Sequence, residues 1–588
     1  MAHFKPPFAF PHHEEFGVPQ SILLHGGREN ELWAAARTFR GVLLAVAGVS
    51  AIVNVLYLTG SLFMLEVYDR VLPSRSVPTL LGLAVLAAML YAFQGVLELL
   101  RNRVLQRVAR SFDEAVNARV YDVLVRLPLA GRGGEGLQPI RDLDQIRSFL
   151  ASGGPSALFD LPWLPFYVVV CFIFHPWIGV MATLGAIVII GLTLLTELMT
   201  RAPAKDAAGY GMRRSVLAEA SRSNAEVMHA LGMAGRVGAR WSAANERFLA
   251  SQQQLGDIAG GFGAASKVLR MMLQSAVLAV GAYLVIHQQA TAGVIIAGSI
   301  LSARALAPVE QVIGNWKGFI GARQGWRRLS ELLQALPARP ERMQLPRPTS
   351  TLSVEMLAVA PPGAGRLCVA DVNFTLHAGQ GLGVIGPSAA GKSSLARALV
   401  GVWRPARGKV RLDGAPLDHW PPEQLGQDIG YLPQNVELFA GSVAENISRF
   451  HDDADPQEII AAARAADVHD MILRLSDGYE TQIGDGGTSL SVGQRQRIGL
   501  ARALFGEPFL VVLDEPNSNL DSEGEEALTQ AMLDVRARGG IVVVVAHRPS
   551  ALAGVDMILM MAEGRQQAFG PKEAVLPKVL RPIAARTA

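Results

Sequence analysis

Four long stretches without a charged residue dominate the first half of the sequence, and they restrict the fold more than any other feature. Residues 41–65 and 77–97 contain no Asp, Glu, Lys or Arg over about 25 and about 21 positions, and either length suffices for a helix to cross the apolar core of a bilayer. Residues 161–196 and 271–302 are almost as apolar but too long for one crossing each.

Both of the longer stretches contain a polar interruption that can form a turn between two crossings. His175-Pro176-Trp177 interrupts the first, and residues 287–289 interrupt the second. The sequence therefore predicts an all-α membrane domain over residues 41–334 with six transmembrane helices. The expected spans are approximately residues 41–65, 77–97, 159–175, 177–197, 266–286 and 290–309.

The distribution of Lys and Arg predicts the orientation of this domain. Residues 98–160 and 197–270 hold roughly 19 basic residues, whereas the short connections on the other side hold about two, Arg70 and Arg75. Because Lys and Arg favour the cytoplasmic side, both termini and both long connections are expected in the cytoplasm. These connections mix apolar and charged residues at helical spacing, so the spanning helices are expected to continue into the cytoplasm. Buried helices of a soluble protein are the alternative, but they rarely show this charge bias.

Composition and local patterns define the remaining segments. The net charge of only +3 favours no general affinity for polyanions, so no nucleic-acid partner is expected. The two cysteines, Cys171 and Cys368, are better explained as buried thiols than as a disulfide framework. Residues 1–40 are polar and irregular, without a cleavable signal, and form an N-terminal cytoplasmic segment. Residues 335–350 are rich in proline and predict a linker, followed by a soluble domain over residues 351–588.

A phosphate-binding loop lies near the start of the soluble domain, between a short apolar strand and a helix. Its glycines let backbone N–H groups turn toward phosphates, and the helix N-terminus adds a favourable partial charge. Lys392 is expected on the phosphate oxygens and Ser393 on Mg²⁺. The loop residues expected to bind the nucleotide are Gly386, Pro387, Ser388, Ala389, Ala390, Gly391, Lys392, Ser393 and Ser394.

An acidic pair ends a second apolar strand. Residues 509–513 are continuously apolar, as in a parallel strand buried on both faces, and Asp514-Glu515 follows at the end where such sheets bind ligands. Asp514 is expected to hold Mg²⁺, and Glu515 to polarise the attacking water as general base. An acidic pair alone often only caps a strand, but the motif that precedes this pair weakens that alternative.

That motif is the pentapeptide Leu490-Ser491-Val492-Gly493-Gln494, which resembles the signature motif of ABC ATPases. In that family the motif closes on the ATP of a second copy. The resemblance therefore implies an α/β P-loop ABC ATPase domain, ATP as the nucleotide and a dimer in which Ser491, Gly493 and Gln494 contact the partner's nucleotide. Val492 stands where the family usually has glycine.

Three further residues match family motifs. Gln434 ends a sequence that resembles the Q-loop and is expected to reach Mg²⁺ and the γ-phosphate. Asp521 ends a sequence that resembles the D-loop, which crosses the dimer interface. His547 resembles the switch histidine; a lone histidine after a strand is usually structural, but its place after the apolar residues 541–545 favours contact with the γ-phosphate. The aromatic residue that stacks on adenine in the family is missing near residues 358–362.

Six spans followed by one ATPase domain resemble half of an ABC exporter. Residues 65–74, 141–147 and 514–521 resemble the type I secretion ATPases that export proteases, lipases and other repeat-in-toxin proteins. That branch tolerates a small residue at the position of Val492. The resemblance implies ATP-driven export of a protein with a C-terminal signal by a homodimer in a bacterial inner membrane. It also implies a periplasmic adaptor (membrane fusion) protein and an outer-membrane channel protein as partners.

Two other functions stay open at this point. One is an ABC exporter of lipids, glycans, peptides or drugs, which would use the same ATPase mechanism on a different cargo. The other is a soluble ABC-type ATPase of DNA repair or translation, which the six expected spans disfavour.

Overall fold

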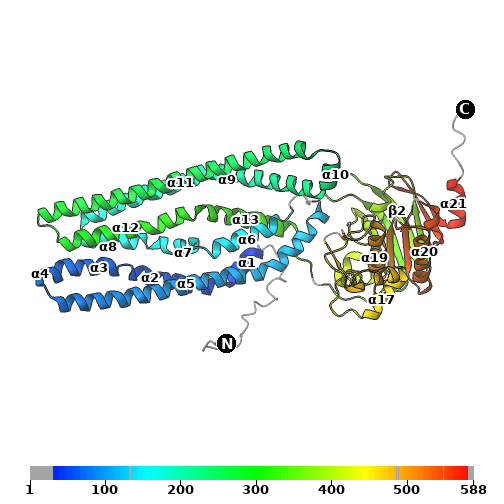
Figure 1. The fold of residues 1–588 in the computed structure, drawn as a ribbon, viewed down its shortest axis with the longest axis horizontal. Helices are drawn as coiled ribbons and strands as arrows, with labels where there is room; N and C mark the ends of the chain where they lie inside the picture. The colour runs from blue at the N-terminus through cyan, green and yellow to red at the C-terminus, as the bar shows by residue number, and fades with distance from the viewer. Residues whose placement is uncertain are drawn as a thin grey trace. The chain divides into compact units, whose positions relative to one another are not determined.

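The computed structural model describes residues 31–131, 136–340, 342–484, 487, 489–518, 520–546 and 548–580. The chain divides into two compact units, Met1–Leu127 with Gly133–Ala338 and Pro128–Arg132 with Arg339–Ala588. The first unit consists of helices, and the second contains a large sheet with helices packed against it (Figure 1). The predicted fold class, an all-α membrane domain followed by an α/β domain, is confirmed.

Six helical segments among the described residues are long and apolar enough to cross a membrane. Three of them are single helices of 48 to 53 residues, α5, α9 and α11. At 1.5 Å per residue they are longer than about 70 Å, more than twice the thickness of a bilayer core. The six segments are Arg40–Ser74, Val77–Arg126 (α5), Gly153–Phe174, Pro176–Ser223 (α9), Ala234–Ile286 (α11) and Ala292–Gly314 (α12).

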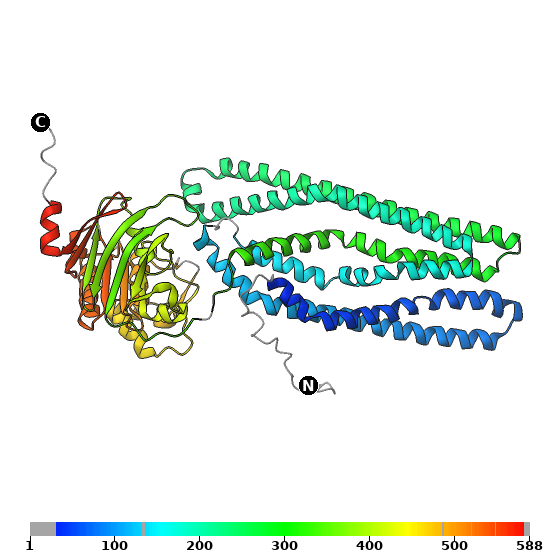
Figure 2. The same cartoon turned by 180° about the vertical axis from the view of Figure 1, so that it is seen from behind.

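The helices α9 and α11 form a long antiparallel pair that is closed at one end by the short helix α10 (Ala225–Ala230). They lie side by side in both views of the molecule (Figures 1 and 2). Apolar side chains stay exposed near the closed end, among them Val227 and Leu231 at 52% and 64%. This end of the pair therefore presents apolar surface that the described residues of the first unit leave uncovered.

Two of the six segments are broken within their length. The first consists of α2 (Arg40–Leu56), α3 (Thr59–Glu66), the π-helical turn η2 (Val67–Val71) and α4 (Leu72–Ser74). The third consists of α7 (Gly153–Asp160), the 3₁₀ turn η5 (Leu161–Trp163) and α8 (Leu164–Phe174). Pro162 and Pro165 explain the break in the third segment, because proline cannot donate the backbone hydrogen bond that continues a helix.

The wide turn η2 places one carboxylate against the start of α12. Asp69 accepts hydrogen bonds from the Thr291 hydroxyl at 2.5 Å and from the Gly293 N–H at 2.9 Å. A side chain at position 293 would overlap this carboxylate, since a Cβ there would lie 2.7 Å from the Asp69 carboxyl carbon. The first and sixth segments are thus joined by a carboxylate at the positively polarised N-terminus of a helix.

A buried polar network joins α2, α5, α7 and α8. The Arg101 guanidinium contacts both carboxylate oxygens of Asp160, at 2.9 and 3.1 Å, and the Ser50 hydroxyl at 3.0 Å. Asn54 donates to Asp160 at 2.8 Å and accepts from the Tyr167 hydroxyl at 2.9 Å. All five residues are buried, so the ion pair is supported by the hydrogen bonds that a charge in an apolar setting requires.

One helix lies where sequence analysis expects an irregular segment. Residues 31–38 form α1 (Glu31–Thr38), which buries Leu32 and Ala35 against α5 and α13 (Trp316–Ala335). An ion pair of 2.9 Å between Glu31 and Arg119 fixes its start. The expectation was wrong here because these eight residues bury their apolar face mainly against α5 and α13, which are distant in sequence. The remaining helix of this unit is α6 (Gln138–Leu150).

The second unit is built on a ten-stranded mixed sheet. Strands β6, β9, β10, β3 and β11 run parallel, while β12 pairs antiparallel with β11, and β1, β2, β4 and β5 pair antiparallel with one another. In sheet order the strands are β5 (Ala415–Pro416), β4 (Arg407–Leu412), β1 (Thr351–Val359), β2 (Val369–His377), β12 (Arg565–Pro571), β11 (Met557–Ala562), β3 (Gly381–Ile385), β10 (Ile541–Val545), β9 (Leu510–Asp514) and β6 (Ile429–Leu432).

The centre of this sheet is covered on both faces. Every residue of β9 and β10 is buried, which explains why both strands are continuously apolar up to Asp514 and Val545. A two-stranded sheet of β7 (Gly441–Ser442) and β8 (Gln482–Ile483) lies apart from it. The longer helices of the unit are α14 (Lys392–Leu399), α17 (Pro456–Ala465), α19 (Val492–Leu504), α20 (Ser522–Ala537) and α21 (Lys572–Leu580), and the shorter ones are α15 (Pro422–Asp428), α16 (Val443–Ile447) and α18 (His469–Leu473).

Candidate nucleotide-binding site

The loop between β3 and α14 is shaped by two glycines that no other residue can replace without strain. Gly386 has φ +152°, and a Cβ there would lie 2.0 Å from the Met561 carbonyl oxygen. Gly391 has φ +91°, and a Cβ there would lie 2.5 Å from the Cys368 carbonyl oxygen. Both positions therefore need the conformational freedom and the small size of glycine. The loop is held tightly against β11 and the start of β2.

Lys392, the first residue of α14, directs its ammonium group back into the loop. The Nζ atom donates to the carbonyl oxygens of Gly386 and Pro387, both at 2.9 Å. Burial lowers the pKa of Lys392, while the carboxylates of Glu515 and Asp514 oppose that shift. A cation and the free N–H groups of a helix N-terminus thus share one loop, which is the arrangement that binds phosphate groups in proteins.

Asp514 and Ser393 meet beside this loop. The Ser393 hydroxyl donates to one Asp514 carboxylate oxygen, Oδ1, at 3.1 Å. The other oxygen, Oδ2, is buried and accepts no hydrogen bond from any residue that the structure describes. Burial raises the pKa of Asp514 above its ordinary value. A buried carboxylate oxygen without a partner, next to a serine hydroxyl, fits a hard divalent cation such as Mg²⁺.

Glu515 and Gln434 come together from neighbouring strands. Glu515 follows β9, Gln434 follows β6, and the Gln434 amide donates to the Glu515 carboxylate at 3.1 Å. Glu515 has φ +54°, a left-handed conformation that is rare for residues other than glycine. Such strain is typically retained at functional sites. The structure therefore places four predicted residues, Lys392, Asp514, Glu515 and Gln434, around one loop.

The predicted signature residues lie at the N-terminus of α19. The Ser491 hydroxyl accepts from the Gln494 N–H at 3.2 Å, and the Gln494 side chain accepts from the Ser491 N–H at 2.8 Å, so the two residues form a capping box. Val492 and Gly493 form the first turn of the helix, with Val492 53% exposed. Among the described residues, no hydrogen bond or ion pair joins Ser491–Gln494 to the phosphate-binding loop.

Asp521 caps the following helix, α20, and is tied to the signature helix. Its carboxylate accepts from the Gly524 N–H at 2.9 Å and from the Arg497 guanidinium at 2.7 Å. The Gly524 hydrogen bond lowers the pKa of Asp521 more than the nearby Arg497 does. Arg497 lies in the second turn of α19, and sequence analysis gave it no role. The predicted His547 lies outside the described residues, so nothing is said of its position.

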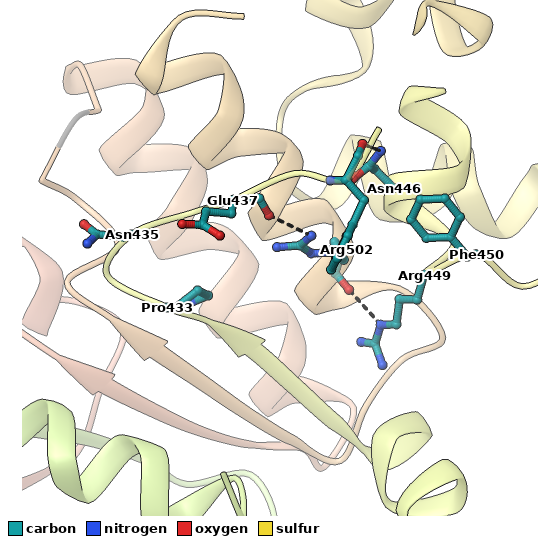
Figure 3. A pocket seen from close by; sticks show the side chains of 8 residues that line it. Pro433, Asn435, Glu437, Asn446, Arg449, Phe450 and Arg502 are labelled. Carbon is teal, nitrogen blue, oxygen red and sulfur yellow. Dashed lines mark hydrogen bonds between the residues drawn. The ribbon is translucent and has the colours of Figure 1, made fainter. Parts of the chain in front are cut away.

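A pocket opens next to Gln434 (Figure 3). It is lined by Pro433 and Asn435, the neighbours of Gln434 in the chain, and by two arginines, Arg449 and Arg502. Sequence analysis gave these arginines no role. The loop that carries Gln434 therefore borders both the phosphate-binding loop and a basic pocket on the same unit.

Comparisons with known proteins agree with this geometry. The family model described as "ABC transporter" matches residues 369–518, and the model described as "ABC transporter transmembrane region" matches residues 43–309. The chain is 60% identical over 557 residues to the type I secretion system ATP-binding protein PrsD of Rhizobium meliloti, covering 95% of this chain and 96% of that relative. It is 29% identical to the cyclolysin secretion/processing ATP-binding protein CyaB of Bordetella pertussis, covering 90% and 75%. A bacterial Atm1-family ABC exporter with ATP bound has the same fold, with a TM-score of 0.78, 23% identity and coverage of 94% and 99%.

Proposed function

The chain belongs to the ABC transporter family as a type I secretion system ATP-binding protein, and from this premise we propose that two copies of it export a protein. It is a multi-pass membrane protein that couples ATP hydrolysis to transport. The observation that carries the proposal is the meeting of Lys392, Asp514, Glu515 and Gln434 around one loop in a chain with six apolar helices.

The proposed roles follow from the positions of the side chains. Lys392 and the N–H groups at the start of α14 bind the phosphates, and Glu515 acts as general base on the attacking water. Gln434 holds the Glu515 carboxylate in place. Ser393, Asp514 and Gln434 would hold Mg²⁺, which would supply positive charge to neutralise the phosphates. By resemblance, His547 contacts the γ-phosphate.

A homodimer follows from two features of the single copy. Ser491 and Gly493 present a helix N-terminus, an anion-binding feature, without a contact to the loop of their own copy among the described residues. The exposed apolar end of the α9–α11 pair is also not covered by other described residues of the first unit. In the proposed dimer, Ser491, Gly493, Gln494 and Asp521 of one copy face the ATP of the other.

The proposed cargo is a secreted protein with a C-terminal signal. Two relatives are named for type I secretion and for cyclolysin secretion/processing. The proposed partners are a periplasmic adaptor protein and an outer-membrane channel protein. The proposed location is the bacterial inner membrane, by resemblance, and the excess of Lys and Arg in residues 98–160 and 197–270 supports an ATPase domain in the cytoplasm.

Reconstitution of the full chain in lipid vesicles tests this function. We expect a peptide made of the C-terminal signal of a co-encoded secreted protein to stimulate ATP hydrolysis, and a scrambled peptide of the same composition to leave it unchanged. Stimulation by lipids or amphipathic drugs, without a response to any signal peptide, would identify an exporter with a different cargo. Coexpression with adaptor, channel and cargo then adds appearance of the cargo in the medium as a second measurement.

A further inference from the structure

Arg449 is held among backbone carbonyl groups at the end of the signature helix. It follows α16 in a left-handed conformation, with φ +57°. Its guanidinium donates to the carbonyl oxygens of Arg502 at 2.9 Å and Ala503 at 3.2 Å, in the last turn of α19. It also donates to the carbonyl oxygens of Gly426 and Ile429, where α15 ends and β6 begins. One side chain thereby joins the end of α19 to the strand that leads to Gln434.

Arg502 makes a second connection to the same loop. Its guanidinium donates to the carbonyl oxygen of Glu437 at 3.1 Å, and Glu437 lies three residues after Gln434. Figure 3 shows both links, with Arg502 bonded to Glu437 through its side chain and to Arg449 through its carbonyl group. The loop of Gln434 is therefore tied to α19 on both sides, before it at β6 and after it at Glu437.

Two arginines in contact with carbonyl groups suit this position for a physical reason. The last carbonyl groups of a helix have no partner within the helix and carry partial negative charge, so a planar cation with several donors binds them well. Burial, and then the neighbouring Arg502, lower the pKa of Arg449 to about 10. Arg449 therefore stays charged at neutral pH, and each of its hydrogen bonds is charge-assisted.

The two ends of α19 and the loop of Gln434 belong to one catalytic arrangement. Ser491 starts the helix, Arg502 and Ala503 end it, and Gln434 contacts the Glu515 carboxylate. We propose that Arg449 and Arg502 are positioning residues for ATP hydrolysis, because they fix the loop that carries Gln434 to the signature helix. The contact between Gln434 and Glu515 is then coupled to the closing of Ser491 on the partner's ATP. This inference rests on the proposed function.

The change Arg502→Met tests the link to Glu437 with the least disturbance. It keeps an unbranched apolar stem and the Arg502 carbonyl that Arg449 binds, but it removes the donor to Glu437. We expect kcat for ATP hydrolysis by the full chain to fall about tenfold, the effect of about 1.4 kcal/mol on a barrier. The affinity of the loop around Lys392 for ATP, measured with a fluorescent ATP analogue, should stay within about twofold.

A double-mutant cycle separates positioning from a merely structural role. If Arg502 acts through Gln434, then Arg502→Met should have no further effect in a chain that already carries Gln434→Ala. Losses of kcat that multiply in the double variant would overturn the inference, and so would wild-type kcat in Arg502→Met alone. Arg474→Gln, which changes an exposed arginine beyond α18 in the same unit, is the matched control and should keep wild-type kcat.

Arg449 supplies the second test, with two variants that differ in severity. Arg449→Met leaves four carbonyl groups without their donor, and Arg449→Lys keeps the charge but loses the planar fork. We expect kcat in the order wild type, Lys, Met, with the ATP affinity unchanged in the Lys variant. A Lys variant with normal kcat and lowered thermal stability would assign Arg449 a structural role and overturn the inference. Absence of ATPase activity in the wild-type chain would instead refute the proposed function.

Discussion

Glu515 has a left-handed backbone conformation, and its side chain offers the sharpest test at the scale of single residues. Replacing it with Gln keeps the size of the side chain and removes the base. We expect Glu515→Gln to lower kcat by at least about 100-fold, while ATP still binds at Lys392 and remains trapped in a closed dimer. Glu523→Gln, at an exposed position in the first turn of α20, should keep full activity. Wild-type turnover in the Glu515 variant would refute the assignment of the base.

Val492 differs from the family pattern, and its surroundings explain why the difference is tolerated. It is the first residue of α19, has an exposed side chain and is not among the residues with positive φ. In the single copy that the structure describes, the backbone at this position does not require glycine. A β-branched residue restricts the conformations that the turn can adopt before the dimer closes. We expect Val492→Gly to keep ATPase activity within about twofold of wild type, with a cost in helix stability near 1 kcal/mol or less. A loss of activity would show that this turn needs the stiffer residue.

Asp514 should destabilise the protein in the absence of metal. Burial raises its pKa, so the folded chain binds this proton more tightly than the unfolded chain, and stability falls as pH rises through that pKa. Asp514→Asn removes the charge and should raise the melting temperature of the nucleotide-free protein, by an amount that corresponds to about 1 kcal/mol. Mg²⁺ with ATP should stabilise the wild type more than this variant, and EDTA should abolish the difference. Equal responses to Mg²⁺ would argue against Asp514 as a ligand.

Sequence reasoning predicted these residues because each belongs to a short local pattern. Asp514 ends an apolar strand and Lys392 starts a helix, and both contexts can be recognised from the sequence alone. Arg449 and Arg502 could not be found in this way, since they act on backbone carbonyl groups of segments distant in sequence. Every residue has a backbone carbonyl group, so the sequence does not indicate which carbonyl group an arginine side chain will bind.

At the scale of elements, the membrane unit depends on one buried ion pair. Arg101→Met leaves Asp160 buried without its cation, and loss of one partner of such a pair costs about 3–5 kcal/mol. We expect a large fall in the melting temperature in detergent. Arg110→Met, on the same helix but in an exposed pair with Glu114, should change it little.

The double variant Arg101→Met/Asp160→Leu should be more stable than the sum of the single changes predicts, because both charges are then gone. Strict additivity would mean that the two side chains do not depend on each other. Sequence analysis gave Asn54 no role in transport, and the structure shows this side chain hydrogen-bonded to Asp160 and Tyr167. It gave Arg101 and Asp160 no role because both lie near the ends of uncharged runs. Charged residues are common at such positions and do not suggest a buried ion pair.

The breaks inside the helices show the same limit. Apolar runs revealed where the chain enters a bilayer, and the polar turn at His175 separates α8 from α9 in the structure. The sequence contains no comparable signal for the π-helical turn η2. This turn is stabilised by a distant contact, the hydrogen bond from the Gly293 N–H at the start of α12 to Asp69. The short helix α1 escaped notice for the same reason, since its stability comes from tertiary packing.

At the scale of the whole molecule, the proposed function requires two copies that share each ATP. In a head-to-tail dimer, one composite site uses Lys392 of the first copy and Ser491 of the second, and the other site uses the reverse pair. Two inactivating changes, one at Lys392 and one at Ser491, therefore leave one composite site intact when they lie in different copies. When both lie in the same copy, they destroy both composite sites. Lys392→Ala removes the phosphate-binding cation, and Ser491→Arg fills the helix N-terminus with a bulky cation.

The most direct measurement is the ATP trapped by mixed dimers in which both copies also carry Glu515→Gln. We predict that a Lys392→Ala copy paired with a Ser491→Arg copy traps ATP, because one composite site keeps both of its parts. A copy with both changes, paired with a copy that has neither, should trap none. The reverse result, with trapping only in the second dimer, would mean that each copy completes its own site and would contradict the shared-nucleotide dimer.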